Sequence, residues 1–110
     1  MSEQPKKIWG PGTWHSIHTT AAWVDSMDKF KFFCTWIRDQ LDKLPCPECT
    51  QHAQEYLMNY PPERTEDVFI WSWRFHNAVN QKLGKPELNY DGAKKLYLDP
   101  KSKTCTGSCA

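Results

Sequence analysis

The 110-residue chain has little of what marks a membrane-spanning, polyanion-binding or hairpin-rich protein. No apolar run approaches the length of a transmembrane helix, and the opening Met-Ser-Glu-Gln-Pro-Lys-Lys does not have the pattern of a signal sequence. The 14 basic and 13 acidic residues leave a net charge of +1 and form no block of one sign, so we expect no nucleic-acid or membrane partner. No Asn-Gly or Asp-Gly turn lies between alternating apolar residues, so no β-hairpin is indicated.

The chain has five cysteines, too few for a disulfide-rich scaffold, and their spacing is unusual. Cys46 and Cys49 form one close pair, Cys105 and Cys109 form another, and Cys34 stands alone. Disulfides that stabilise small secreted proteins usually close long loops, whereas each pair here would close a very short one. Redox or metal chemistry is therefore the better hypothesis for the pairs. Cys34 lies on an apolar helical stripe, and we expect it to pack as a small hydrophobic side chain.

Proline and glycine divide the chain into segments of helical length. Apolar residues recur at steps of three and four within these segments, which predicts an all-α bundle of four main helices followed by a short fifth helical segment. The expected helices cover residues 13–25, 30–44, 47–60, 66–83 and 91–98. Thr65 is a suitable N-cap for the fourth helix, and Gly84 with Pro86 should end that helix. The length and the 39% hydrophobic share indicate one domain with a single core.

The motif Cys46-Pro-Glu-Cys49 is expected at the start of the third helix. Pro47 suits the first helical turn, so Cys46 would lie at a helix N-terminus, where a thiolate is favoured over a thiol. Such a pair is suited to disulfide exchange. The alternative is half of a zinc site, with Cys105 and Cys109 as the other half or His52 as a third ligand. The distance in sequence to the second pair makes the redox interpretation preferable.

The second pair, Cys105-Thr-Gly-Ser-Cys109, follows a polar stretch with the composition of a mobile tail. A mobile dithiol next to a fixed one is suited to carrying electrons from a substrate to the core. The alternative is a tail disulfide with a structural role or none.

Two further motifs place flat or polar side chains on helical faces. His76, Asn77 and Asn80 lie among apolar residues of the fourth helix, and together they could line a slot for a flat aromatic ligand such as a nucleotide base. Trp14 and His18 lie four residues apart, on one face of the first helix, and could form another wall. Taken alone, each motif is better explained as ordinary packing: a helix with a polar face and a packed histidine for the first, and core residues for the second.

In combination, three motifs resemble the Erv/ALR family of FAD-linked sulfhydryl oxidases. They are WGPGTWHSIHTTAA at residues 9–22, PCPEC at 45–49 and HNAVNQKLGKP at 76–86. Their order and separations match the family, and the resemblance extends over residues 9–98.

The resemblance implies a four-helix bundle with a short fifth helix, FAD bound at the mouth of the bundle, and a homodimer. It implies that Cys49 lies next to the flavin, that Cys46 is the outward partner that exchanges with a shuttle dithiol, and that Cys105 and Cys109 are the candidate shuttle. The positions that match FAD contacts in the family are Gly12, Trp14, His18, His52, His76, Asn77, Val79, Asn80, Lys82, Leu83, Lys85 and Tyr97. Of these, Tyr97 stands where many members have tryptophan.

Many family members also have a bridging cysteine pair where this chain has Trp73 and Tyr90. We therefore expect hydrophobic packing in place of that bridge. Another difference is Leu44, which stands where the family often has an aromatic residue.

The implied activity is the oxidation of dithiols in protein substrates, such as thioredoxin-like or CxxC proteins, with electrons passing through Cys46–Cys49 and FAD to oxygen and yielding hydrogen peroxide. The expected organisation is a flexible segment at 1–8, the FAD-binding domain at 9–98 and a mobile tail at 99–110. The minimal form resembles viral members, which implies host cytoplasm or virion, with the mitochondrial intermembrane space as the alternative. Two rivals are a zinc-binding adaptor that uses Cys46, Cys49, Cys105 and Cys109, and a helical interaction domain with structural disulfides.

Overall fold

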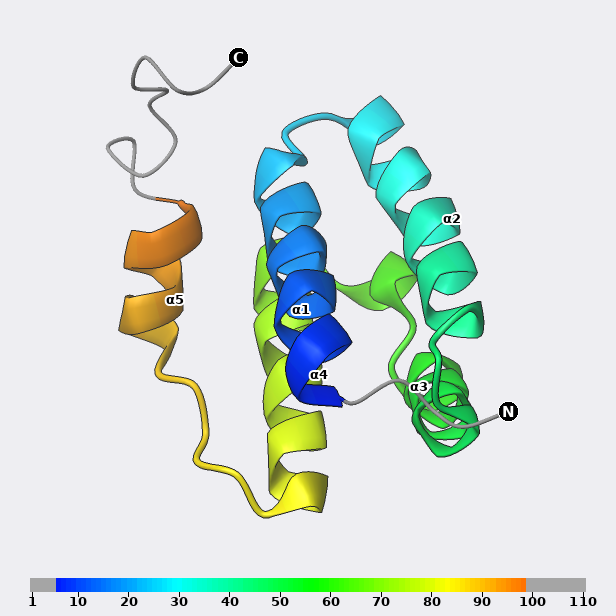
Figure 1. Ribbon diagram of the computed structural model, residues 1–110. Coiled ribbons are helices and arrows are strands. Elements are labelled where there is room, and N and C mark those ends of the chain that lie inside the picture. Colours follow the sequence, from blue (N-terminus) through cyan, green and yellow to red (C-terminus); the bar gives the residue numbers. More distant parts are fainter. Residues whose placement is uncertain (1–5, 99–110) are drawn as a thin grey trace.

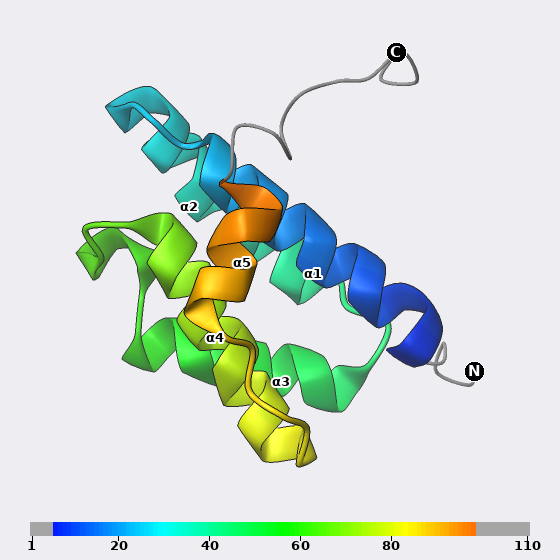
Figure 2. The same ribbon diagram turned by 90° about the vertical axis from the view of Figure 1, so that its left-hand side faces the viewer.

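The computed structural model describes residues 6–98, with side chains from residue 9 onward, and this part of the chain is entirely helical. The helices are α1 (Lys6–Trp23), α2 (Met27–Asp42), α3 (Pro47–Asn59), α4 (Val68–Leu83) and α5 (Tyr90–Tyr97), with a 3-10 turn η1 (Pro62–Arg64) before α4. Helices α1 to α4 form a bundle in which α1 packs on α4 and α2 packs on α3 (Figure 1). The short α5 lies across the outer side of α1 and α4 (Figure 2). The predicted all-α bundle with a short fifth helix is confirmed.

Local sequence signals explain most of the helix ends. Ser26 caps α2, where its hydroxyl accepts a hydrogen bond from the N–H of Lys29, and Asn89 caps α5 through the N–H of Gly92. Gly84 ends α4 in the left-handed region at φ 71°, where glycine carries no Cβ penalty. None of the described helices is both long and apolar enough to cross a bilayer.

Three predicted helix starts were wrong. Helix α2 begins at Met27 rather than residue 30, because Ser26 caps it. Helix α1 begins at Lys6 rather than near residue 13, and it continues through Pro11. Pro11 lacks the N–H that would donate to the carbonyl of Lys7, but the hydroxyl of Thr13 donates to the carbonyl of Trp9 at 3.0 Å in the same turns. At the start of α4 the N-cap is Asp67 rather than Thr65, because the carboxylate of Asp67 accepts hydrogen bonds from two helix N–H groups, at 2.8 and 3.3 Å.

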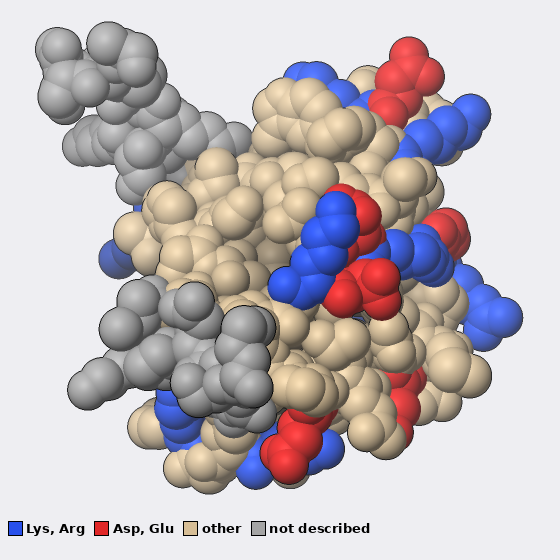
Figure 3. Space-filling view, turned by 45° about the vertical axis from the view of Figure 1, so that its right-hand side comes forward, with Lys and Arg blue, Asp and Glu red and all other residues tan. Residues whose placement is uncertain are grey.

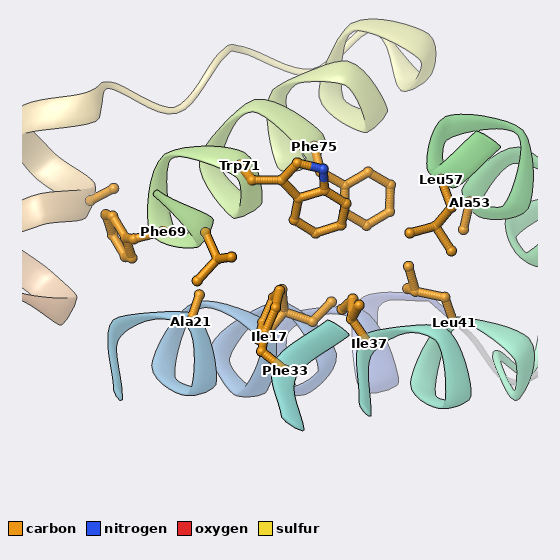
Figure 4. Packing of buried hydrophobic residues seen from close by; sticks show 12 residues of the cluster. Ile17, Ala21, Phe33, Ile37, Leu41, Ala53, Leu57, Phe69, Trp71 and Phe75 are labelled. Carbon is orange, nitrogen blue, oxygen red and sulfur yellow. The ribbon is translucent and has the colours of Figure 1, made fainter. Parts of the chain in front are cut away.

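One hydrophobic core joins the five helices. Its centre is aromatic, with Trp71 and Phe75 of α4 facing Phe33 and Ile37 of α2 (Figure 4). The other members are Ile17, Ala21, Leu41, Ala53, Leu57, Val68, Phe69 and Ala93. Because α1, α3 and α4 all contribute to this core, it fixes the relative positions of the three helices that carry the candidate site residues.

Cys34 is a free cysteine that is 5% exposed in α2, as expected for a small hydrophobic residue. Burial, with a smaller effect of the nearby Glu63 carboxylate, raises the pKa of its thiol to about 11. It is therefore a thiol at neutral pH and unsuited to disulfide exchange.

Acidic and basic side chains lie next to one another on the surface. Arg38 pairs with Glu63, Lys29 with Asp25, and Lys43 with Asp39. The face drawn in Figure 3 likewise shows both signs intermixed. This distribution agrees with the small net charge and with the absence of a charged block in the sequence.

Candidate active site

The disulfide between Cys46 and Cys49 lies at the N-terminus of α3, with the two Cα atoms 5.2 Å apart. Cys46 is the N-cap, and its sulfur accepts a hydrogen bond from the N–H of Cys49 at 3.2 Å. Pro47 occupies the first helical turn, where its missing N–H costs nothing. The predicted position of Cys46 at a helix N-terminus is therefore confirmed, and the helix dipole favours negative charge on this sulfur.

The exposure of the two cysteines differs from the expectation that Cys46 is the outward member of the pair. Cys49 is half-buried and lines a cavity, whereas Cys46 is only 1% exposed and thus is not the outward member of the pair in this conformation. The physical reason is the capping bond, which turns the sulfur of Cys46 back toward the first turn of α3 and away from solvent.

The cavity has a volume of about 620 Å³ and is lined by residues of α1, α3 and α4, the end of α2, and Tyr97 of α5. Nine of the twelve predicted cofactor-contact residues line it. These nine are Trp14, His52, His76, Val79, Asn80, Lys82, Leu83, Lys85 and Tyr97. A cavity of this size is typical for an organic ligand or cofactor.

One wall of the cavity is a pair of stacked rings. The indole of Trp14 lies parallel to the imidazole of His76, with centroids 3.9 Å apart and an interplanar angle of 5°. Phe75 also lines the cavity, and its ring centroid lies 5.1 Å from that of the indole. The stack joins α1 to α4 and presents a flat surface suited to a flat aromatic ligand.

His18 lies directly behind this wall, is 1% exposed and does not line the cavity. Its Nε2 lies 2.8 Å from Nδ1 of His76, and its Nδ1 lies 3.0 Å from the hydroxyl of Ser72. Burial is the main cause that lowers the pKa of both imidazoles to about 4. Both rings are consequently neutral at physiological pH.

Asn77 also lies outside the cavity wall and has a structural role. Its side-chain oxygen accepts from the N–H of Leu88 at 2.6 Å, and its amide nitrogen donates to the carbonyl of Leu88 at 3.0 Å. Trp73 donates from its indole nitrogen to the same carbonyl at 2.7 Å. These bonds hold the α4–α5 connection against α4. Gly12 is exposed and does not line the cavity.

The rim of the cavity carries basic and polar groups. Lys82 lies in the last turn of α4 and Lys85 follows its C-cap; both are exposed and line the cavity from that side. Burial, with a smaller effect of the charge on Lys82, lowers the pKa of His52 on α3. The site thus combines a flat apolar wall and a disulfide with two cations, which suits an aromatic ligand that also carries anionic groups.

The sequence motifs did not identify every residue of the cavity wall. The additional lining residues are Trp9, Gly10, Pro11, Thr13, Ile17, Leu41, Leu44, Glu48, Ala53 and Phe75. The spacing of Trp9, Thr13 and Ile17 at steps of four along α1 is the signal that could have predicted their shared face.

Trp73 and Tyr90 pack against each other as expected. Their ring centroids lie 5.1 Å apart, with an interplanar angle of 64°. Trp73 and Tyr90 stand where the bridging cysteine pair of the family was expected to be absent, and at this place aromatic packing joins α4 to α5.

The chain matches the model of the Erv1/Alr family over residues 11–98. This chain belongs to the Erv1/Alr family. The match spans α3 with its disulfide, α4, α5 and most of α1.

Curated relatives of this chain come from viruses and from plants. An African swine fever virus protein named FAD-linked sulfhydryl oxidase is 32% identical over 87% of this chain and 85% of its own length. The FAD-linked sulfhydryl oxidase ERV1 of Arabidopsis thaliana is 32% identical over 73% of this chain and 44% of its own length. Sulfhydryl oxidase 1 of the same plant is 27% identical over 69% of this chain and 15% of its own length.

Cys105 and Cys109 lie outside the described residues, as do residues 1–5 and the rest of 99–110. Within residues 6–98, no group of three or more histidine, cysteine or acidic side chains is arranged to hold a metal ion. Cys46 and Cys49 are joined to each other, and a disulfide supplies no thiolate for zinc. Nothing in this part of the chain supports the zinc-binding alternative.

Proposed function

We infer that this protein is an FAD-dependent sulfhydryl oxidase that converts dithiols into disulfides. The observation that carries this conclusion is the position of Cys49, which belongs to an intact disulfide and lines the same cavity as the stacked Trp14 and His76. A redox-active disulfide and a flat ligand surface in one cavity are what electron transfer from thiols to a flavin requires. Membership of the Erv1/Alr family, whose curated members include FAD-linked sulfhydryl oxidases, supports the same activity.

The residues present fit FAD. The cavity of about 620 Å³ has flat, largely apolar walls for a ring system, and Lys82 and Lys85 can balance the charge of a pyrophosphate. When bound, FAD accepts the two electrons of a dithiol and passes them to oxygen, which yields hydrogen peroxide. We propose that the nine lining residues contact the cofactor, and that Gly12, His18 and Asn77 support it from outside the wall.

The protein itself carries out the thiol–disulfide steps. A substrate thiolate attacks the sulfur of Cys46, the Cys46–Cys49 bond breaks, and Cys49 leaves as a thiolate next to the cavity. A second substrate thiolate then attacks the substrate sulfur of the mixed disulfide and releases Cys46. The substrate dithiol has lost two electrons and two protons, and Cys46 and Cys49 are both reduced.

The helix N-terminus assists the release of Cys46. The N–H of Cys49 points at the sulfur of Cys46 and stabilises negative charge there as the mixed disulfide breaks. Because Cys46 is buried in the oxidised conformation, a substrate must first expose this sulfur by displacing its surroundings. Exposure of Cys46 is thus a step at which substrates can be distinguished.

Further proposals concern the remainder of the chain and its setting. We propose that Cys105 and Cys109 form the shuttle dithiol and follow an oxidase domain at 9–98. The leading segment expected at 1–8 overlaps helix α1, which begins at Lys6, so the expected boundary at residue 8 was wrong. We also propose a homodimer that acts on CxxC-containing or thioredoxin-like proteins with oxygen as acceptor. The viral relatives support a setting in host cytoplasm or virion.

Oxygen uptake with dithiothreitol, measured with and without added FAD, tests the activity. We expect a yellow protein that releases flavin on denaturation and consumes oxygen only when thiol is present. A colourless protein that takes up no FAD and consumes no oxygen would refute the proposal. The shuttle is tested separately with Cys105→Ser, which should retain activity on dithiothreitol and lose it on a dithiol protein.

A further inference from the structure

A chain of hydrogen bonds crosses the interface between α1 and α4 behind the cavity. It begins at the backbone carbonyl of Phe69, passes through the Ser72 hydroxyl at 2.7 Å and His18 Nδ1 at 3.0 Å, and continues from His18 Nε2 to His76 Nδ1 at 2.8 Å. Ser72 is fully buried and His18 is 1% exposed, so no water competes for these bonds. The chain ends at Nε2 of His76, the other ring nitrogen of a residue that lines the cavity.

The direction of the first bond is set by chemistry. A carbonyl oxygen can only accept, and two oxygens 2.7 Å apart are favourable only with a proton between them. The single hydroxyl proton of Ser72 therefore points at Phe69. Toward His18 the serine oxygen can only accept, so Nδ1 of His18 carries a proton.

This direction propagates along the chain through the two imidazoles. Both rings are neutral at pH 7, because burial lowers the pKa of each to about 4. A neutral imidazole has one N–H, so His18 has its proton on Nδ1 and its Nε2 is an acceptor. His76 must then donate from its own Nδ1, which leaves Nε2 of His76 without a proton.

The unprotonated nitrogen faces open space. Nε2 of His76 has no hydrogen-bond partner among the described residues. Every buried side-chain nitrogen and oxygen atom among these residues does have a partner, so an atom without one is not buried. This atom is therefore accessible, and His76 lines the cavity.

We propose that the bonds from Phe69 through Ser72 and His18 hold His76 in the tautomer protonated on Nδ1, so that the cavity wall offers its ligand a hydrogen-bond acceptor at Nε2. Ser72 is then a positioning residue that acts through two histidines on a site it does not touch. The ligand selected is one that places an N–H or O–H donor at this point. This inference rests on the proposed function in that FAD carries such donors, namely the amine of its adenine, the imide of its flavin and its sugar hydroxyls.

Nuclear magnetic resonance of ¹⁵N-histidine-labelled protein tests the tautomers directly, because protonated and bare ring nitrogens have well-separated shifts. At neutral pH we expect His18 and His76 to show a protonated Nδ1 and a bare Nε2 in the FAD-free protein, and the Nε2 signal of His76 to move on addition of FAD. A proton on Nε2 of His76, or a charged ring, overturns the proposal. The FAD-free spectrum decides the tautomer even if the protein does not bind FAD, so the inference and the proposed function fail separately.

Ser72→Ala tests the positioning role. Removal of the acceptor for His18 should convert the single tautomer of His76 into a mixture and raise the dissociation constant for FAD about three- to tenfold, the value of one hydrogen bond. Ser16→Ala, at an exposed position of α1, is the matched control and should change neither quantity. A Ser72→Ala protein that keeps the wild-type tautomer at His76 contradicts the role of Ser72. If this variant does not fold, the wild-type spectrum decides.

Discussion

The indole of Trp14 and the imidazole of His76 lie in parallel contact, with centroids 3.9 Å apart, although 62 positions separate them in the chain. Because the rings touch, a ligand can stack only on a face that the pair leaves open. Trp14→Leu removes this flat surface and should weaken FAD binding about tenfold or more, in keeping with the free energy of ring stacking. Fluorescence titration of the FAD-free protein measures the change. Trp23→Leu, at an exposed residue near the end of α1, is the control and should bind FAD like the wild type.

Cys49→Ser should abolish thiol-dependent oxygen consumption while the fold is retained, because the disulfide closes a very short loop and contributes little to stability. Circular dichroism checks the fold, and an oxygen electrode checks the activity. Cys34→Ala removes a buried thiol that the mechanism does not use, and its activity should remain near the wild-type rate. Full activity in Cys49→Ser would show that electrons do not pass through this disulfide.

The buried histidines make stability depend on pH. The pKa of His18 is about 4 in the folded protein and about 6.5 when unfolded, so between these values the unfolded state binds more protons. The contribution of neutral His18 to the free energy of unfolding is fully present above pH 6.5. It decreases by on the order of 3 kcal/mol as the pH falls toward 4. Urea unfolding at a series of pH values measures this loss. His18→Gln should make the profile shallower and leave the part due to His76, whose pKa is also lowered to about 4. A wild-type profile as shallow as that of His18→Gln would contradict the buried neutral ring of His18.

Lys82 and Lys85 are expected to attract the pyrophosphate of FAD. Lys82→Gln or Lys85→Gln should each raise the dissociation constant about threefold at low salt, and less at high salt, because exposed charges are screened. Lys94→Gln on α5, which removes a cation near Tyr90 and away from the cavity lining, is the control of equal charge change. Equal effects of all three substitutions would indicate only a nonspecific influence of net charge.

The pair Trp73 and Tyr90 is expected to stabilise the contact of α5 with α4. Trp73→Phe keeps an aromatic ring and removes the hydrogen bond from the indole to the carbonyl of Leu88, so it should lower the free energy of unfolding by about 1 kcal/mol. Tyr90→Phe keeps the ring contact and should have a smaller effect. Denaturant unfolding compares the two, and an unaffected Trp73→Phe would show that the bond adds nothing.

Much of the fold was predictable because its signals are local. Helical periodicity and turn residues predicted the bundle, Pro47 predicted where α3 begins, and Gly84 predicted where α4 ends. The start of α1 was missed because glycine and proline at 10–12 indicate a break, whereas the helix continues through Pro11. Thr65 and Asp67 are both good caps, and sequence preference alone does not distinguish them.

The candidate site was predictable in its residues more than in its geometry. Motif matching identified about half of the cavity lining, but it did not reveal that Cys46 is covered or that His18 lies behind His76. Both facts depend on how separate helices meet. Ser72 carries no signal of its own, since a buried serine acquires its role only when α1 places a histidine against it.

The packing of Trp73 on Tyr90 has a consequence for how the newly made protein matures. In the described part of the chain the only disulfide is Cys46–Cys49, and side-chain packing and hydrogen bonds join the helices to one another. Such a bundle can assemble in a reducing compartment while all of its thiols are free. An enzyme of this kind would not depend on an earlier oxidase, because loading with cofactor would be enough to begin its first turnover.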